Sequence, residues 1–278
     1  MTWPERIRER PQMCRKDRGR QNMTRRTRLT AVSAFHYARL IYRFVLFVVL
    51  LVAYIIRRIS NGPAILDTLE QMPFLLAFTC ALFTVEMILR FFPSRLESPG
   101  CQKQFARNYI KSGKTEIAIQ DNNGTVLVLL IWIGFNAAIG ALHMMEVIDD
   151  SIMLLISCAY SVCDMICILF FCPFQTWLLK NKCCSTCRIY NWDYAMMFTP
   201  LFFVRKPYTW GLLGLSIALL IRWEVTFYLH PERFSDQTND YLQCRNCTEK
   251  LCMHKKQLLT LWEEIAEYTA KKKKQLLK

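Results

Sequence analysis

The segment ARLIYRFVLFVVLLVAYIIRR, Ala38 to Arg58, decides the fold class of this chain. It is apolar along almost its whole length, and a helix needs about 20 mostly apolar residues to cross the hydrocarbon core of a bilayer. Tyr208–Leu229 has a similar length but contains the charged residues Arg222 and Glu224. Three further stretches have the required length and apolarity: Pro73–Phe92, Val126–Met145 and Ser151–Cys172. The sequence therefore predicts an all-α, polytopic integral membrane helix bundle.

Composition agrees with this class and argues against several others. The 278 residues are 53% hydrophobic, above the roughly 45–50% of soluble domains. No phosphate-cradling glycine loop, HExxH pair or nucleophile elbow is present, so the sequence contains no catalytic signature. The net charge of +14 has no groove-reading or base-stacking motif beside it, so we expect no nucleic-acid partner.

Charge placement predicts the orientation. Met1–Ala34 carries ten Arg or Lys residues against three acids, which keeps this basic N-terminal segment in the cytoplasm. About thirty polar residues precede the first apolar block, which is unlike a cleaved signal peptide. We therefore expect that block to stay in the mature chain as a span of a multi-pass protein of the cell membrane. Met23 is an alternative start of translation, so the sequence leaves open whether residues 1–22 belong to the native protein. By the same rule the loop 93–125 faces the cytoplasm and the acidic turn 146–150 faces outside.

The segment IYNWDYAMMFTPLFFV, Ile189 to Val204, decides whether the chain has five or six spans. It is apolar but only sixteen residues long, and Pro200 interrupts it. If it does not cross, there are five spans and the tail lies outside. If it crosses, there are six, both termini are cytoplasmic, and Glu86, Asp164 and Arg222 lie at one depth. Because intramembrane charges normally pair, this common depth slightly favours six spans.

Two CxxC pairs suggest a metal site. CSTC and CRNC supply Cys184, Cys187, Cys244 and Cys247, and paired short-spaced thiolates are the usual ligands of structural zinc or an iron–sulfur cluster. Neighbouring residues that could add ligands are Cys183, Cys252 and His254. The interval between the pairs exceeds the usual zinc-ribbon spacing of about 15–20 residues. The pairs can share an ion only if an even number of crossings separates them.

Three charged residues within the spans form a second group of candidates: Glu86, Asp164 and Arg222. An acid deep in an apolar helix is a functional candidate by default. If six spans are correct, Arg222 is the expected partner of Asp164. Such a pair either fixes helix packing or lines the pathway of an ion or small solute.

The predicted organisation has three parts: a basic segment 1–34, a transmembrane domain 35–230 with cytoplasmic loops 93–125 and 173–190, and a Cys-rich tail 231–278. Apolar residues at three- and four-residue steps predict an amphipathic helix near the C-terminus, which could dock on the bilayer or on a protein partner. The leading functional hypothesis is a binding or regulatory protein with a cytoplasmic tetra-Cys metal site. A small-solute or ion transporter and a membrane thiol–disulfide oxidoreductase are the alternatives.

Overall fold

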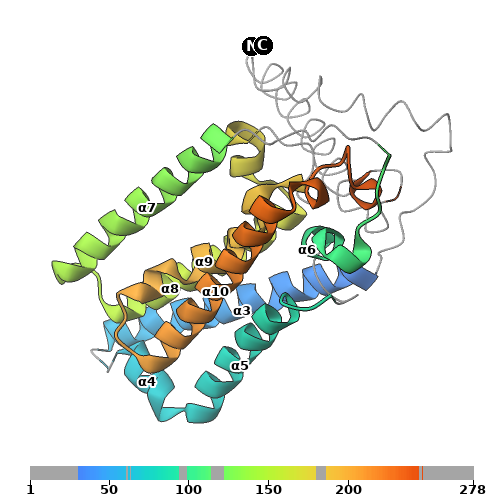
Figure 1. The fold of residues 1–278 in the computed structure, drawn as a ribbon. Coiled ribbons are helices and arrows are strands. Elements are labelled where there is room, and N and C mark those ends of the chain that lie inside the picture. Colours follow the sequence, from blue (N-terminus) through green and yellow to red (C-terminus); the bar gives the residue numbers. More distant parts are fainter. Residues whose placement is uncertain are drawn as a thin grey trace, which may run out of the picture.

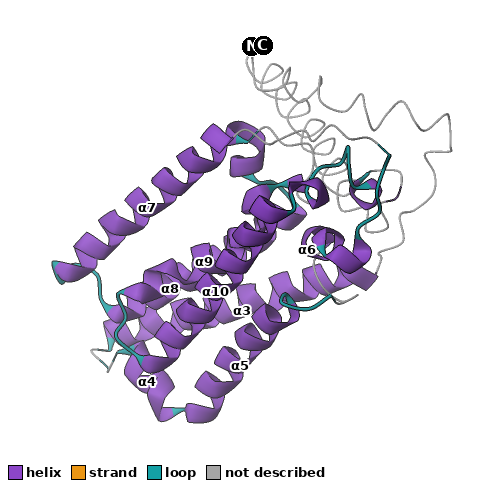
Figure 2. Cartoon of the chain, viewed as in Figure 1, coloured by secondary structure: helices purple, strands orange, loops and turns teal. Residues whose placement is uncertain are grey.

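In the computed structural model, the described residues form helices joined by short loops, with one isolated β-bridge between Lys111 and Asn239 (Figure 2). The structure describes residues 31–60, 62, 64–93, 99–113, 122–179, 186–243 and 246. The all-helical prediction is confirmed for this part of the chain. The predicted basic segment and C-terminal amphipathic helix lie outside the described residues, apart from the first residues of helix α3.

Four helices are long and apolar enough to cross a membrane: α3 (Ala31–Ile59), α7 (Asn122–Met144), α8 (Asp150–Leu169) and α10 (Pro207–Leu229). A fifth candidate is the pair α4 (Ile65–Gln71) and α5 (Pro73–Leu89), which is bent by 99°. By length and composition, the described residues therefore contain four spans, or five if the bent pair counts as one.

Local sequence explains where these helices begin. Pro73 and Pro207 occupy the first turn of α5 and α10, where the missing proline N–H costs nothing. Asp149 caps α8, because its side-chain oxygen accepts a hydrogen bond of 2.8 Å from the Ile152 N–H.

The helices run between two ends of the bundle (Figure 1). We call these the Glu70 end and the Gln104 end, after one residue at each. The Glu70 end carries the α4–α5 corner and the α7–α8 turn. The Gln104 end carries the short helix α6 (Pro99–Gln104). Beside it lie the helical turns of the tail, η6 (Pro231–Arg233) and η7 (Asp240–Leu242). The Asn239 amide, in that tail, donates to the Lys103 carbonyl at 3.0 Å.

The segment that sequence analysis could not assign runs from one end to the other. It consists of η4 (Arg188–Trp192), α9 (Asp193–Phe198) and η5 (Thr199–Phe202). At its start the Asn191 amide donates to Gln104 at 2.9 Å. Just after its end, Lys206 forms an ion pair with Glu70 at 2.6 Å. Helix α10 then runs back to the Gln104 end, where Glu224 meets Arg188.

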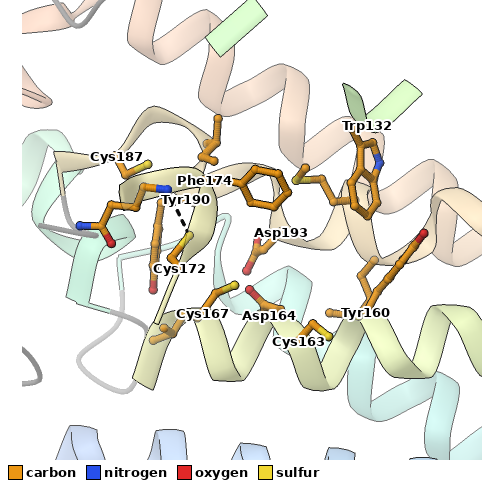
Figure 3. Close-up of a pocket in the computed structure, with 15 residues that line it drawn as sticks. Trp132, Tyr160, Cys163, Asp164, Cys167, Cys172, Phe174, Cys187, Tyr190 and Asp193 are labelled. Atoms are coloured by element: carbon orange, nitrogen blue, oxygen red, sulfur yellow. Dashed lines mark hydrogen bonds between the residues drawn. The ribbon is translucent and has the colours of Figure 1, made fainter. Parts of the chain in front are cut away.

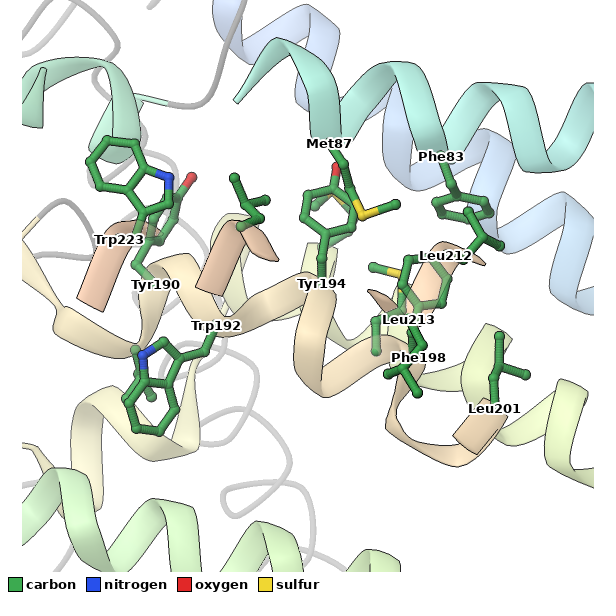
Figure 4. Packing of buried hydrophobic residues seen from close by; sticks show 14 of the residues in the cluster. Phe83, Met87, Tyr190, Trp192, Tyr194, Phe198, Leu201, Leu212, Leu213 and Trp223 are labelled. Carbon is green, nitrogen blue, oxygen red and sulfur yellow. The ribbon is translucent and has the colours of Figure 1, made fainter. Parts of the chain in front are cut away.

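This segment lies at the centre of the core (Figure 4). Tyr194 and Phe198 are buried between α5 and α10, and the rings of Phe83 and Phe198 meet edge to face at 5.5 Å. Irregular backbone is tolerated at membrane depth only where protein surrounds it. The burial of these residues satisfies that condition.

Helix α7 stands at one side of the bundle and contacts mainly η5 and η2 (Phe174–Leu178) (Figure 1). Gly140 permits the close approach of Phe203, the residue after η5, because a Cβ atom at position 140 would lie 2.0 Å from the Phe203 ring. Gly134 has nothing within 4 Å of the same position. Of these two glycines, only Gly140 brings another element close to the helix.

Candidate functional site

The most densely charged part of the interior is centred on Glu86 of α5. Its Oε1 accepts hydrogen bonds from Arg39 Nε at 3.0 Å and from the Tyr42 hydroxyl at 2.6 Å. Its Oε2 accepts from Arg43 Nη2 at 2.9 Å and from the Tyr194 hydroxyl at 2.8 Å. One carboxylate thus joins α3, α5 and α9.

Arg43 extends this network to α8. Its Nη1 lies 3.0 Å from Asp164 Oδ2 and also donates to the Ser161 carbonyl at 3.1 Å. The Arg43 side chain is fully buried. A buried guanidinium is tolerated when it is paired and hydrogen-bonded, and here it bridges Glu86 and Asp164.

A second ion pair lies beside the first. Arg90 binds Asp193 through two contacts, Nη1 to Oδ1 at 2.7 Å and Nη2 to Oδ2 at 2.6 Å. The first contact is a charge-assisted hydrogen bond, and the second brings the remaining guanidinium nitrogen and carboxylate oxygen together as an ion pair. The guanidinium also lies 4.5 Å from the centroid of the Tyr194 ring. Each of the three acids Glu86, Asp164 and Asp193 therefore has an arginine partner.

An apolar chamber of about 750 Å³ begins next to this network. Its walls come from α3, α4, α5, α8, α9, η5 and α10, and Tyr42, Phe83 and Ser161 close it on the side of the charges. The exposed lining residues Ile41, Val45 and Val49 on α3, and Leu75 and Phe78 on α5, indicate that the chamber opens between these two helices.

The hydroxyl groups in the chamber wall already have partners within the protein. Ser157 donates to the Met197 carbonyl at 2.9 Å, and Thr79 donates to the Leu75 carbonyl at 2.9 Å. At the Glu70 end, the Tyr208 hydroxyl donates to Glu70 at 3.1 Å. The wall therefore presents an almost wholly apolar surface. Lys206 also binds Glu70. The side-chain hydrogen bond between these two residues raises the pKa of Lys206, so this lysine stays charged at neutral pH.

A second, smaller cavity of about 120 Å³ lies on the other face of α8 (Figure 3). Cys163 and Cys167 reach it from α8, and Cys172 and Cys187 from the chain that follows. Asp164 and Asp193 point toward it between these sulfur atoms (Figure 3). The ring of Trp132 from α7 and the ring of Tyr160 lie at its edge.

Two of the three intramembrane candidates, Glu86 and Asp164, lie in the charged network, but the predicted pairing of Asp164 with Arg222 is wrong. Asp164 pairs with Arg43 and not with Arg222. Arg222 instead donates to the Phe91 carbonyl, and its guanidinium lies 5.2 Å from the centroid of the Phe91 ring. The reason is that α3, rather than α10, packs along the charged face of α8.

Of the predicted metal ligands, the structure describes only Cys187, which is buried at the Gln104 end. Within the described residues, no three His, Cys, Asp or Glu side chains converge to hold a metal ion. The other predicted ligands lie outside the described residues: Cys183, Cys184, Cys244, Cys247, Cys252 and His254. The tetra-Cys site therefore stays a prediction.

The chain was compared with known families, sequences and structures. It matches no protein-family model, no curated protein and no solved structure.

Sequence reasoning missed Arg39, Arg43 and Asp193. The first two are four residues apart within the first apolar block, so they share one helix face. Charged residues inside a span are functional candidates by default, and this signal was available in the sequence. Asp193 had no comparable signal, because it lies in the segment whose path was ambiguous.

Proposed function

We propose that this protein is an integral membrane protein that binds a lipid acyl chain or a similarly apolar molecule in the chamber between α3 and α5. The observation that carries the proposal is the chamber itself, with a volume of about 750 Å³ and walls that are almost entirely apolar. Ligand pockets in proteins typically measure about 300–1,000 Å³.

The character of the walls argues for an apolar occupant. The chamber opens between α3 and α5, and its lining is almost wholly apolar. Water finds few hydrogen-bond partners on such walls, whereas an apolar molecule from the bilayer can fill the space.

The length of the chamber fits part of an acyl chain. The α3 residues that line the chamber run from Ile41 to Leu50, and nine helical steps of about 1.5 Å span about 14 Å. Half of a hydrocarbon core of about 30 Å is about 15 Å. The charged network closes the chamber toward the Gln104 end, so the ligand enters between α3 and α5. The basic N-terminal segment supports a cytoplasmic Gln104 end and an outer Glu70 end.

The test is photolabelling of the full chain in lipid nanodiscs with a phospholipid that carries a photoreactive group on its acyl chain. We expect crosslinks to concentrate on chamber residues such as Val45 and Phe78. Two variants, Cys80→Phe and Cys158→Phe, fill the chamber and should reduce this labelling about tenfold, which corresponds to about 1.4 kcal/mol of binding free energy.

Cys163→Phe is the matched control, because it adds the same ring to α8 on the opposite face and should leave the labelling unchanged. Labelling spread evenly over the outer helix faces in the wild type would overturn the proposal. So would equal labelling of Val45 and Phe78 in the wild type and in folded Cys158→Phe and Cys80→Phe proteins.

The tetra-Cys site remains a second candidate function, and one observation favours it. Cys187, which belongs to the first Cys pair, and Gln243, which precedes the second, lie in segments that pack at the same end of the bundle. Purified protein should contain close to one zinc or one iron–sulfur cluster per chain, lost on replacing Cys184 and Cys187 with Ser. Thiol–disulfide exchange at CSTC predicts instead that Cys184 is rapidly alkylated near neutral pH.

A further inference from the structure

The smaller cavity beside α8 has an unusual concentration of sulfur. Four cysteines and two methionines line it: Cys163, Cys167, Cys172, Cys187, Met196 and Met197. They come from α8, from the loop after it, from the residue that precedes η4 and from α9. This cavity is separate from the apolar chamber, so the inference below does not depend on the proposed lipid ligand.

Two of these thiols already contact each other. The side chains of Cys167 and Cys172 are hydrogen-bonded, which places their sulfur atoms close enough to share one small ion. The Gln175 backbone N–H lies 3.4 Å from Cys172 Sγ and stabilises negative charge on that sulfur. Cys163 lies one helical turn before Cys167, and the i, i+4 spacing puts both on the same face of α8.

The ligand chemistry favours a soft ion. Carboxylate oxygens would suit a hard cation, but an oxygen of Asp164 contacts Arg43 and both oxygens of Asp193 contact Arg90. Structural zinc takes four ligands, and among the described residues no three His, Cys, Asp or Glu side chains converge to hold an ion. Thiolate and thioether sulfur select monovalent copper, which accepts as few as two sulfur ligands.

We propose that the Cys167–Cys172 thiol pair binds one Cu(I) ion in this sulfur-lined cavity. Binding replaces two thiol protons with one cation: Cu⁺ plus two thiols gives a two-coordinate copper dithiolate of charge −1 and two released protons. The thioethers of Met196 and Met197 argue for a metal rather than for disulfide exchange, because a thioether takes no part in that exchange.

The test uses the full chain with the other cysteines of the loop and tail, Cys183, Cys184, Cys244, Cys247 and Cys252, replaced by Ser, so that these thiols do not contribute. Cu(I) is added without oxygen and competed against a coloured Cu(I) chelator. We expect one copper per chain, with sulfur-only coordination in X-ray absorption. Cys167→Ser and Cys172→Ser should each weaken binding by about 100-fold or more, or about 2.8 kcal/mol.

Cys80→Ser and Cys158→Ser are matched controls, because these thiols lie in helices but line the apolar chamber instead. They should retain copper. A second readout needs no variant in the cavity: copper should protect Cys167 and Cys172 from alkylation in the otherwise unchanged chain. The proposal is overturned if a folded Cys167→Ser/Cys172→Ser protein keeps its copper, if copper leaves both thiols open to alkylation, or if zinc binds there as tightly as copper.

Discussion

At the scale of single residues, Arg43 connects two carboxylates of the buried network. It contacts Glu86 and Asp164 at once and is completely buried. Removing one member of a buried ion pair leaves the partner charge without compensation, which typically costs about 3–5 kcal/mol. Here two carboxylates would lose the same guanidinium.

Arg43→Met should therefore lower the free energy of unfolding by about 3–5 kcal/mol, measured by thermal or denaturant unfolding in detergent. Arg58→Met, on an exposed position of the same helix, is the control and should change stability by less than about 0.5 kcal/mol. An Arg43→Met protein as stable as the Arg58→Met protein would show that the network does not hold these helices together.

Sequence alone identified Glu86 and Asp164 as candidates but not their partners. An acid inside an apolar block is visible in one sequence. Its partner depends on which helices are neighbours and how each is rotated, and neither property follows from hydropathy or charge placement. A common depth in the membrane suggested Arg222 as the partner of Asp164. In the structure α3 packs on α8, so the partner is Arg43.

At the scale of elements, the long apolar helices could be predicted from sequence but the path from Arg188 to Lys206 could not. This path changes from a 3₁₀ turn to an α-helix and back to a 3₁₀ turn. It is too short and too irregular to resemble a span, and Pro200 breaks the helical pattern. Surrounding helices stabilise it, so its conformation depends on tertiary contacts that a local pattern does not contain.

Two glycines of α7 should respond in opposite ways to replacement by alanine, because only one of them lies against the ring of Phe203, the residue after η5. Gly134→Ala should raise stability by up to about 1 kcal/mol, because alanine is the better helix former and the added methyl group meets no neighbour. Gly140→Ala should lower stability by about 1–3 kcal/mol, because the Phe203 ring must move. Unfolding of both variants in detergent checks this, and a stabilising effect of Gly140→Ala would mean that α7 does not pack on Phe203.

At the scale of the whole molecule, the central claim is that the chain passes through the bundle from the Gln104 end to the Glu70 end between Arg188 and Lys206. This passage forms one wall of the apolar chamber and brings the tail back to the end where Cys187 lies. It is the physical basis for an even number of crossings between the two CxxC pairs.

The most direct test inserts the same flexible loop, carrying one N-glycosylation acceptor site, at one of three places: after Gly113, after Val147 or after Gln243. The chain is translated into endoplasmic reticulum membranes in an Asn22→Gln/Asn123→Gln/Asn246→Gln background, which removes the acceptor sequences Asn22-Met23-Thr24, Asn123-Gly124-Thr125 and Asn246-Cys247-Thr248. We predict that the Gly113 and Gln243 loops behave alike and that the Val147 loop behaves oppositely. If the Gln243 loop is glycosylated when the Gly113 loop is not, or the reverse, the chain does not cross between Arg188 and Lys206 and the claim is wrong.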